Sequence, residues 1–314
     1  MYDVVALGEL LIDFTTQATD PDGYPTMAAH PGGAPASFLA AVAQFSGKAA
    51  LLGKVGTDTF GKLLTGTLRK AGIETKGIVA SDDVFTTLAF VTLDENGDRE
   101  FAFARKPGAD TQLRFEELDL SILDETRVFH FGTLSLTDEP ARGTTYRAVE
   151  YAKAHGKLVT FDPNLRRPLW KSLDDAKEQM LWGLDHADVV KISDEEIEFL
   201  FGLGVQDGAQ YILEHFPVRL VFATCGAEGC WFQNRNAGGH VDSLKNIKVV
   251  DTTGAGDIFG GSAVWKLLQT GKAPEDLSEA ELREIVSFAC KAAGLSTTKP
   301  GGISSVPEFN FDTK

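Results

Sequence analysis

Basic residues are scarce in this sequence of 314 residues. Lys and Arg together number 30, against 45 Asp and Glu, which gives a formal net charge of −15. Such a balance disfavours nucleic acid and anionic membrane surfaces as partners, because both are bound through clustered cations. It leaves room for a local basic pocket that binds one small phosphate compound.

Cysteine is almost as scarce. Cys225, Cys230 and Cys290 are too few and too scattered for a disulfide scaffold. Neither these thiols nor the six histidines have the spacing of zinc ligands. We therefore expect buried thiols in a reducing compartment.

Long hydrophobic runs are missing as well. No apolar run approaches the ~18 residues that indicate a membrane span. The segment from Met1 to Asp13 has no basic leader and contains Asp3 and Glu9, so it predicts a core strand rather than a signal peptide. These absences favour a cytoplasmic protein.

What the sequence does contain is an alternation of strand and helix patterns. Apolar runs rich in β-branched residues predict strands at Val4–Leu7, Ala49–Val55, Val128–Phe131, Leu158–Phe161, Val189–Ile192 and Val218–Ala223. Helical patterns follow at Asp58–Ala71, Glu139–His155, Asp174–Leu184, Asp194–Phe201, Ala255–Gln269 and Glu279–Ser296. Buried strands with helical crossovers predict a mostly parallel sheet covered on both faces.

One region interrupts this alternation. The stretches Thr86–Asp94 and Arg99–Arg105 are strand-like, and Glu95–Asp98 between them contains the Asn-Gly pair of a hairpin turn. Such a hairpin is either a lid over a site or a plain antiparallel extension of the sheet, and the pattern leaves both open. We find no repeat and no long linker, so residues 1–314 are expected to form one domain.

The segment Asp251-Thr-Thr-Gly-Ala-Gly-Asp257 carries the strongest chemical signal. It leads from a short apolar strand into a helix, so Gly254, Ala255 and Gly256 place backbone N–H groups at a helix N-terminus, where they can bind a phosphoryl group. Asp257 lies in the first turn, where a carboxylate can accept the proton of an attacking hydroxyl. The structural alternative is an N-capped helix after a tight turn.

Two further segments carry polar groups that suit a sugar. Asp13 lies beyond the first strand and can accept hydrogen bonds from hydroxyls, while Gly33 lets a ligand approach the backbone closely. Asn164 follows a later strand and offers a donor and an acceptor, and Arg166 beside it can neutralise phosphate. Taken alone, the first segment is better explained as an ordinary turn, and the second is explained equally well as a Pro-rich surface loop.

Ser193 and Glu196 begin a helix with the spacing of a capping box, which is a sufficient structural explanation. The functional alternative is that Glu196 orders the water shell of Mg²⁺. The glycine-rich segment Ala223–Gly229 is either a turn between strands or a surface along a nucleotide. Asp251 and Gly301–Ser305 are either structural or support an ion.

In this order, these segments resemble the ribokinase-like (PfkB-type) carbohydrate kinases, and especially the bacterial fructokinases, from about Asp3 to about Pro307. The resemblance implies an α/β fold: a Rossmann-like αβα sandwich with a mostly parallel central sheet and a small β-sheet lid formed by about residues 12–30 and 85–110. It implies ATP-dependent phosphorylation of a sugar on a primary hydroxyl, with D-fructose as the expected substrate. The implied cofactors are ATP, Mg²⁺ and potassium.

The resemblance also assigns roles to single residues. Asp257 is the base. The anion hole consists of Gly254, Ala255 and Gly256, and Arg166 is the cation that assists it. The sugar is faced by Asp13, Gly32, Gly33, Ser37, Phe101, Phe103, Arg105, Asn164 and Asp257. The nucleotide is faced by Ser193, Thr224, Gly226, Gly229, Gly256 and Cys290. Glu196 acts on Mg²⁺ through water, and the monovalent cation is surrounded by Asp251, Thr253, Gly301 and Ser305.

Ser37 and Ser193 depart from the family pattern, since many relatives carry Asn at these positions. Serine cannot present an amide donor together with a carbonyl. The first departure puts the identity of the sugar in question, and the second weakens the inference of Mg²⁺.

Three alternative functions remain. A 2-keto-3-deoxygluconate kinase of the same fold would need a cation for its substrate carboxylate, for which Arg99, Arg105 and Arg166 are candidates. A ribose or riboside kinase is the second. A catalytically inactive sugar-sensing protein is the third, and the intact segment Gly254–Asp257 argues against it. An exposed apolar lid would favour a homodimer through the lid.

Overall fold

The structure is a computed structural model that describes residues 1–93 and 99–308, with the side chains of residues 93 and 99–101 outside this description. Within these residues, no helix is both long enough and apolar enough to cross a membrane.

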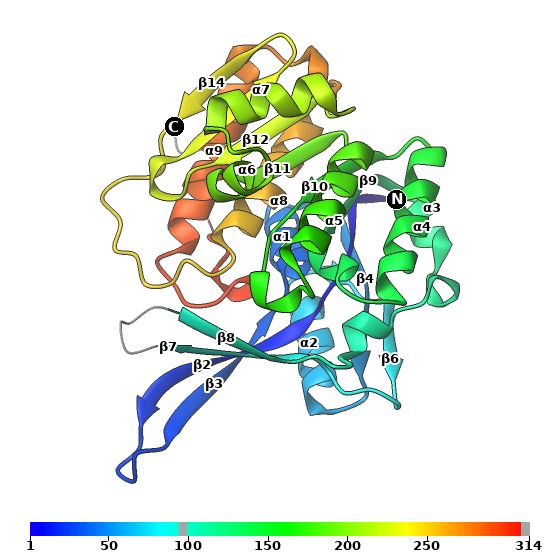
Figure 1. The fold of residues 1–314 in the computed structure, drawn as a ribbon, viewed down its shortest axis with the longest axis vertical. Coiled ribbons are helices and arrows are strands. Elements are labelled where there is room, and N and C mark those ends of the chain that lie inside the picture. Colours follow the sequence, from blue (N-terminus) through cyan, green and yellow to red (C-terminus); the bar gives the residue numbers. More distant parts are fainter. Residues whose placement is uncertain (94–98, 309–314) are drawn as a thin grey trace.

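A large sheet forms the centre of the molecule (Figure 1). In the described part of the chain it has ten strands in the order β14-β13-β12-β11-β10-β9-β1-β4-β5, with β6 beside β4. The strands are β1 (Tyr2–Leu7), β4 (Ala49–Gly56), β5 (Ile73–Glu74), β6 (Ile78–Ser81), β9 (Thr126–Gly132), β10 (Leu158–Asp162), β11 (Val189–Ser193), β12 (Leu220–Thr224), β13 (Cys230–Asn234) and β14 (Gly238–Val241). All pairs are parallel except those that join β13 to β12 and to β14.

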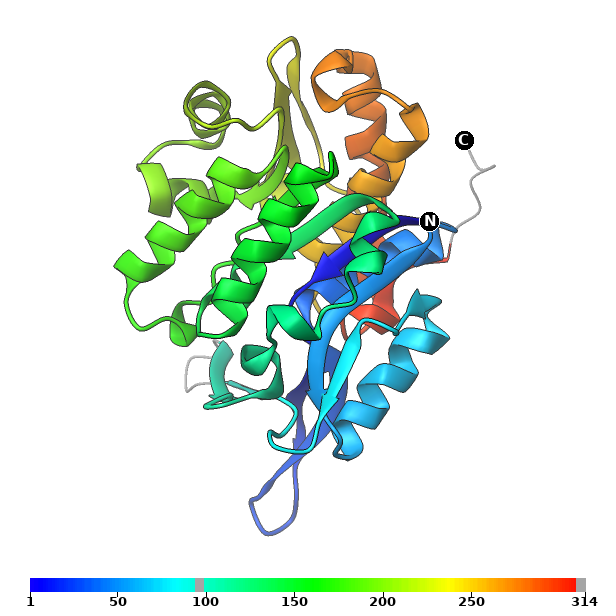
Figure 2. The ribbon, with the colours of Figure 1, turned by 90° about the vertical axis from the view of Figure 1, so that its right-hand side faces the viewer.

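Helices cover both faces of this sheet, as Figure 2 shows edge-on. One face packs against α1 (Ala34–Gln44), α2 (Thr59–Lys70), α8 (Ala255–Thr270) and α9 (Glu279–Ser296). The other face packs against α3 (Leu120–Asp124), α4 (Ala141–Ala154), α5 (Leu173–His186), α6 (Asp194–Phe201) and α7 (Val205–His215).

The helices on both faces explain why the central strands are mostly apolar along their length. In β1, Val5 and Leu7 belong to the core on one face, while Val4 and Ala6 belong to the core on the other. Because successive side chains point to opposite faces, a strand that is buried on both sides is mostly apolar, and polar residues such as Lys54 in β4 and Lys191 in β11 are paired within the protein. The predicted parallel αβα sandwich is confirmed.

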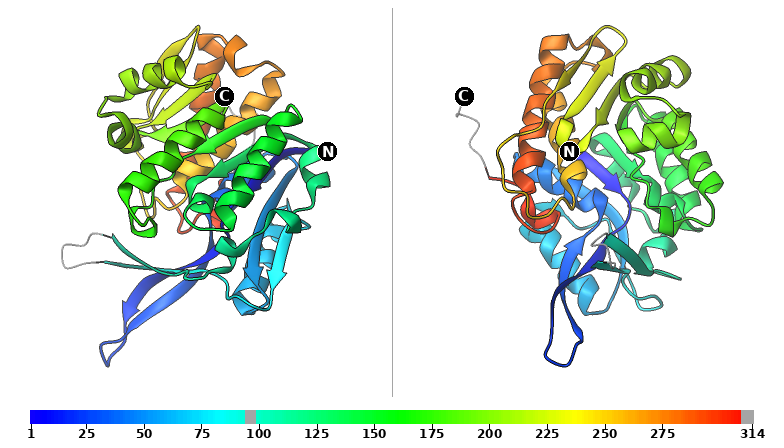
Figure 3. Two further views of the ribbon diagram at one scale, coloured as in Figure 1. Left: turned by 45° about the vertical axis from the view of Figure 1, so that its right-hand side comes forward. Right: turned by 60° about the vertical axis from the view of Figure 1, so that its left-hand side comes forward.

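A second, smaller sheet has four strands in the described chain, in the order β3-β2-β7-β8. They are β2 (Leu11–Thr19), β3 (Pro25–Gly32), β7 (Leu88–Leu93) and β8 (Arg99–Ala104). The β2–β3 hairpin projects away from the main body (Figure 3). The predicted strand pair is therefore part of a separate sheet and not an extension of the central one, while its predicted turn at residues 95–98 lies outside the described residues.

The order of the central strands reverses around β1, since the chain adds β4 on one side of it and β9 on the other. In open α/β sheets, ligands bind beside the carboxyl ends of the strands at such a switch point. The carboxyl ends of β1, β9, β10, β11 and β12 all lie at this edge, because these strands are parallel and in register. The small sheet leaves the central one at the same end of β1.

Candidate active site

The turn before α8 holds the helix N-terminus open. Gly254 is the N-cap residue with a left-handed φ of 74°, and as a glycine it supplies no capping side chain. A Cβ placed on Gly254 would lie 2.8 Å from the Cα of Gly302, so a larger residue does not fit. The N–H of Ala255 donates to the carbonyl oxygen of Thr252 at 3.3 Å. The other N–H groups of the first turn have no side-chain cap, so they and the positive end of the helix dipole are available to an anion.

Asp257 lies in the first turn of α8 and is partly buried. Burial is the main reason that its pKa is raised to about 8, and the charge of Asp162 raises it further, while Lys191 and Arg166 oppose the rise. The carboxyl group thus stands beside the open helix end with a pKa near neutral pH, which suits a group that exchanges a proton.

Asp162 and Lys191 form an ion pair next to this carboxyl group. Lys191 Nζ lies 3.1 Å from Asp162 Oδ2, and the two side chains are 13% and 6% exposed. Asp162 is the last residue of β10 and Lys191 lies within the adjacent strand β11. Sequence analysis assigned neither residue to the site. A lysine inside an apolar strand is unusual, and this signal could have identified Lys191.

A buried carboxylate organises the loop that precedes α1. Glu9 Oε1 accepts a hydrogen bond of 2.9 Å from the N–H of Ala34, the first residue of α1. Gly33 has a φ of 121°, and a Cβ there would lie only 2.4 Å from the carbonyl oxygen of Glu9. Burial raises the pKa of Glu9 to about 7, and the hydrogen bond from Ala34 opposes this rise. Glu9 is a third residue that sequence analysis did not assign to the site.

Asp13 lies on β2, beside the crossing to the small sheet. A Cβ on Gly32 would lie 2.0 Å from Asp13 Oδ2, so the glycine leaves room for this carboxylate. Burial raises the pKa of Asp13 to about 6, and the positive charge of Arg166 opposes the rise. Arg166 therefore acts on both Asp13 and Asp257, although its own side chain is exposed.

Asn164 is buried directly after β10 and adopts a left-handed φ of 45°. A small cavity is lined by Glu9, Ala34, Asp162 and Asn164 among others. The structure thus brings the loop before α1 and the loop after β10 to one place.

Ser37 is buried in α1 and lies against the turn before α8. A Cβ on Gly254 would lie 3.4 Å from Ser37 Oγ, and a Cβ on Gly302 only 2.3 Å from it. The hydroxyl therefore contacts the backbone that carries the open helix end. Its contact with a sugar stays a prediction.

The small sheet presents one face with a carboxylate and an aromatic ring. Asp13 pairs with Ala89, and Ala89 pairs with Phe103, which is half-buried. Residues that are paired directly share a face, so Asp13 and Phe103 do. The side chain of Phe101 lies outside the described residues.

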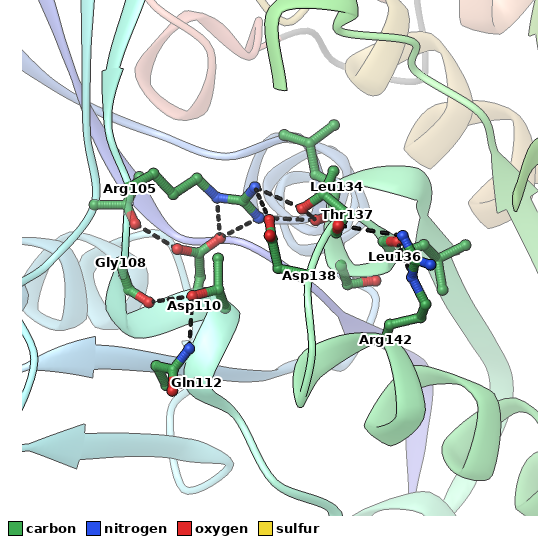
Figure 4. A network of polar contacts seen from close by, with 12 residues as sticks. Arg105, Gly108, Asp110, Gln112, Leu134, Leu136, Thr137, Asp138 and Arg142 are labelled. Carbon is green, nitrogen blue, oxygen red and sulfur yellow. Dashed lines mark hydrogen bonds and ion pairs between the residues drawn. The ribbon is translucent and has the colours of Figure 1, made fainter. Parts of the chain in front are cut away.

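Arg105 follows β8, where it is buried and anchors the small sheet to the main body (Figure 4). Its Nε donates to Asp110 Oδ2 at 2.8 Å and its Nη1 donates to Thr137 Oγ1 at 2.7 Å. Its Nη2 donates to the carbonyl oxygen of Leu134 at 2.8 Å. All three guanidinium nitrogens therefore have protein partners.

Ser193 and Thr224 end the neighbouring strands β11 and β12 and are paired with each other. The turn after β12 is closed by a hydrogen bond of 2.8 Å from the N–H of Cys225 to the carbonyl oxygen of Gly229. Gly226 and Gly229 have left-handed φ values of 51° and 106°. The turn exposes backbone at the carboxyl edge of the sheet.

Cys290 lies deeper than expected for a residue that faces a ligand. It is 6% exposed and belongs to the core cluster that contains Phe222 and Phe259. Burial raises the pKa of its thiol to about 12. The contact with adenine stays a prediction.

Glu196 is fixed by two backbone donors. Its Oε2 accepts the N–H of Ser193 at 2.8 Å, and its Oε1 accepts the N–H of Leu165 at 2.7 Å. Among residues 1–93 and 99–308, no group of three or more Asp, Glu, His or Cys side chains could hold a metal ion directly. A Mg²⁺ ion here would be held by phosphates and water, with Glu196 acting through that water, and this assignment stays a prediction.

Asp251 gathers the residues expected around a monovalent cation. Its Oδ1 accepts hydrogen bonds from the N–H and the hydroxyl of Thr253, at 2.9 and 2.7 Å. Its Oδ2 accepts the N–H of Gly301 at 2.9 Å. Ser305 is buried in the following turn, where its hydroxyl donates to the carbonyl oxygen of Gly302 at 2.8 Å. Carboxylate, hydroxyl and carbonyl oxygens are suitable ligands for a hard cation.

Known proteins are similar to this chain over nearly its whole length. Residues 1–308 match the model of the pfkB family carbohydrate kinases. The chain is 41% identical over 307 residues to fructokinase-2 of Solanum lycopersicum, which covers 97% of this chain and 93% of the relative. The structure of a fructokinase from Xylella fastidiosa with bound ATP has a TM-score of 0.89, at 30% identity over 98% of this chain and 96% of that one.

A double mutant of a fructokinase from Vibrio cholerae, with fructose, ADP and a potassium ion bound, has a TM-score of 0.85. Its sequence is 30% identical, over 98% of this chain and 96% of that one. Both the sequence and the fold match over nearly the whole length. The open N-terminus of α8, with Asp257 in its first turn, is thus part of a chain that belongs to the pfkB family of carbohydrate kinases.

Proposed function

We propose that this protein transfers the γ-phosphoryl group of ATP to a primary hydroxyl of D-fructose and forms fructose 6-phosphate. The observation that carries the proposal is the open N-terminus of α8 with Asp257 in its first turn. The charge of Arg166 acts on both Asp257 and Asp13, and Asn164 lies in the same loop as Arg166. The fructokinases of Solanum and Xylella, similar over nearly the full length, support fructose as the sugar.

In this reaction, ATP supplies the phosphoryl group. Asp13 and Asn164 bind hydroxyl groups of the sugar and orient one of them towards Asp257. Asp257 accepts the proton of that hydroxyl as its oxygen attacks, and its pKa of about 8 suits this task near neutral pH. The N–H groups at Gly254–Gly256 and the charge of Arg166 stabilise the negative charge of the transition state.

The small sheet excludes water from the reaction, because water would compete with the sugar as phosphoryl acceptor. Phe103 lies on the same face as Asp13 and covers an apolar side of the sugar.

Glu196 would act on Mg²⁺ through water, and Asp251, Thr253, Gly301 and Ser305 would hold a potassium ion. The cluster around Asp251 and the potassium ion in the Vibrio structure support the second assignment. Three free cysteines agree with a reducing compartment such as the cytoplasm.

A keto-acid substrate is less well supported. Its carboxylate needs a cation, and Arg105 already donates to Asp110, Thr137 and Leu134. We therefore retain fructose as the proposed substrate.

The test is a coupled kinase assay over fructose, ribose, glucose and 2-keto-3-deoxygluconate. Fructose should exceed each of the others by ~10-fold or more in kcat/KM, because buried polar groups are left unpaired when a hydroxyl is missing or misplaced. Asp257→Asn should lower kcat by at least ~10² while fructose binding, measured by calorimetry, persists. Preference for another sugar would contradict the substrate, and a near wild-type kcat of D257N would contradict the catalytic base.

A further inference from the structure

Lys191 is a buried cation whose side chain reaches the start of α8. In β11 its neighbours Val190 and Ile192 face the core on one side of the sheet, so Lys191 faces the other side, where α8 lies. A Cβ placed on Gly256 would lie 3.0 Å from Lys191 Nζ and 3.5 Å from its Cε. The ammonium group therefore packs directly against the backbone of the residue before Asp257.

The side chain is fixed in this place by Asp162. Lys191 Nζ lies 3.1 Å from one carboxylate oxygen of Asp162 and 3.3 Å from the other. The negative charges of Asp162, Glu196 and Asp257 together raise the pKa of Lys191 against the effect of burial. The lysine is therefore cationic at neutral pH, and a nearly buried pair of this kind is screened little by solvent.

Four charged groups act on Asp257, each from a different segment. Asp162 at the end of β10 and Glu9 after β1 raise its pKa, while Lys191 in β11 and Arg166 in the loop after β10 lower it. Arg166 is exposed, so water and salt screen its charge. Lys191 is the opposing cation that lies in the protein interior.

We propose that Lys191 is a positioning residue for phosphoryl transfer: held by Asp162 against Gly256, it favours the carboxylate form of Asp257 and fixes the first turn of α8 around it. This inference rests on the proposed function, because it assigns Asp257 the role of base. It also explains the glycine at position 256, since a side chain there would displace the ammonium group.

The kinetic test uses Lys191→Met, which keeps the length of the side chain and removes its charge. The acid limb of the pH profile of kcat/KM for fructose should move upwards by about one pH unit or more, because Asp257 loses its interior cation. Activity should recover as the pH rises, and KM for ATP should stay within ~3-fold of wild type. Lys191→Arg should keep the acid limb near its wild-type position.

The matched control is Lys54→Met. Lys54 is also a buried lysine in the central sheet, with its Nζ 2.6 Å from Glu117, and it is not among the groups that shift Asp257. K54M should lose stability and keep the wild-type pH profile. An unchanged acid limb in K191M, or an equal shift in K54M, would overturn the proposal. The proposal would also be overturned if K191M raised KM for ATP by ~10-fold or more and left the acid limb of the pH profile unchanged. Lys191 would then act on the nucleotide.

K191M leaves Asp162 buried without its partner and can therefore fail to fold. Asp162→Asn provides the second test, because it removes a charge that raises the pKa of Asp257 and keeps Lys191. The acid limb of the pH profile of D162N should move to lower pH, and a shift to higher pH would contradict the proposal.

A readout without turnover separates this inference from the proposed function. The carboxyl carbon of Asp257 is followed by ¹³C NMR in the sugar-free protein and identified by its loss in D257N. The pH at the midpoint of its titration should rise in K191M and fall in D162N, even if the wild-type protein phosphorylates another substrate. An unmoved midpoint in both variants overturns the role of Lys191, whereas failure of fructose turnover alone overturns only the proposed function.

Discussion

Asp257 combines a functional position with a cost in stability. Burial raises its pKa to about 8, against ~3.9 for an aspartate in water. Between about pH 4 and pH 8, the carboxyl group of Asp257 is therefore mostly protonated in the folded state and mostly ionised in the unfolded chain. The free energy of unfolding therefore falls as the pH rises from about 4 to about 8.

Asp257→Asn removes this dependence, because the amide carries no charge at any of these pH values. We expect D257N to be more stable than wild type at pH 8, by about 1 kcal/mol or more, and the advantage to shrink towards pH 4. Urea unfolding of both proteins at several pH values measures the difference. A difference that stays constant with pH would mean that Asp257 is ionised in the folded protein throughout.

At the scale of elements, the first turns of α1 and α8 hold the two loops of the site. α8 begins at a glycine whose conformation no larger residue adopts easily, and α1 begins after Gly33, which is pressed against the backbone of Glu9. The hydrogen bond from Ala34 to Glu9 then fixes the entry to α1. Both helix ends are thus positioned by backbone contacts, which explains why the site needs glycine at these places.

Gly33→Ala should destabilise the protein by roughly 1–3 kcal/mol, because the alanine would have to keep a φ of 121° with its Cβ near Glu9. KM for the sugar should rise as the loop shifts. The control is Gly66→Ala in α2, where a Cβ would meet no atom within 4 Å. G66A should raise stability by about 0.5–1 kcal/mol, since alanine is the better helix former. Thermal unfolding and steady-state kinetics test both variants, and equal effects would contradict the strain at Gly33.

At the scale of the whole molecule, the C-terminal segment completes a cluster with residues fifty positions earlier in the chain. The N–H of Gly301 bonds Asp251, which in turn bonds Thr253 next to the open helix end. A cation in this cluster would stabilise the turn that carries the anion hole.

Replacing a large organic cation with potassium at equal ionic strength should therefore raise kcat. Asp251→Asn should weaken the response, because it removes the negative charge beside the ion. The measurement is kcat over a wide range of potassium concentrations. Indifference to the exchange would remove the ion from the mechanism.

The small sheet also offers a surface for a second copy of the chain. β3 and β8 are its outer strands, and Tyr24 and Phe85 beside the sheet are 69% and 54% exposed. We expect a homodimer through this sheet, since outer strands and exposed rings favour pairing. Analytical ultracentrifugation of wild type and Tyr24→Asp tests this, and a wild-type protein that sediments as a monomer at all concentrations contradicts it.

Local patterns were enough to predict most of the central architecture. The predicted helices at Asp194–Phe201 and Glu279–Ser296 have the bounds seen in the structure, and the predicted central strands are all present. Missed were α7, the short elements α3, β5 and β6, and the antiparallel pairing at β13 and β14, whose strands are short and only partly buried. The strand predictions succeeded where burial on both faces requires a continuous apolar run. They failed where half-exposed strands have only a short or interrupted apolar pattern.

The sequence by itself determined the fold class, the family and the segment Asp251–Asp257, because each depends on residues that are close in the chain. Only the tertiary structure decided that Lys191 is paired with Asp162, that Glu9 bonds Ala34 and that the guanidinium of Arg105 is bonded within the protein. The physical reason is that a side chain's charge and contacts depend on its neighbours in space. Those neighbours come from different strands, which the chain brings together only when the sheet forms.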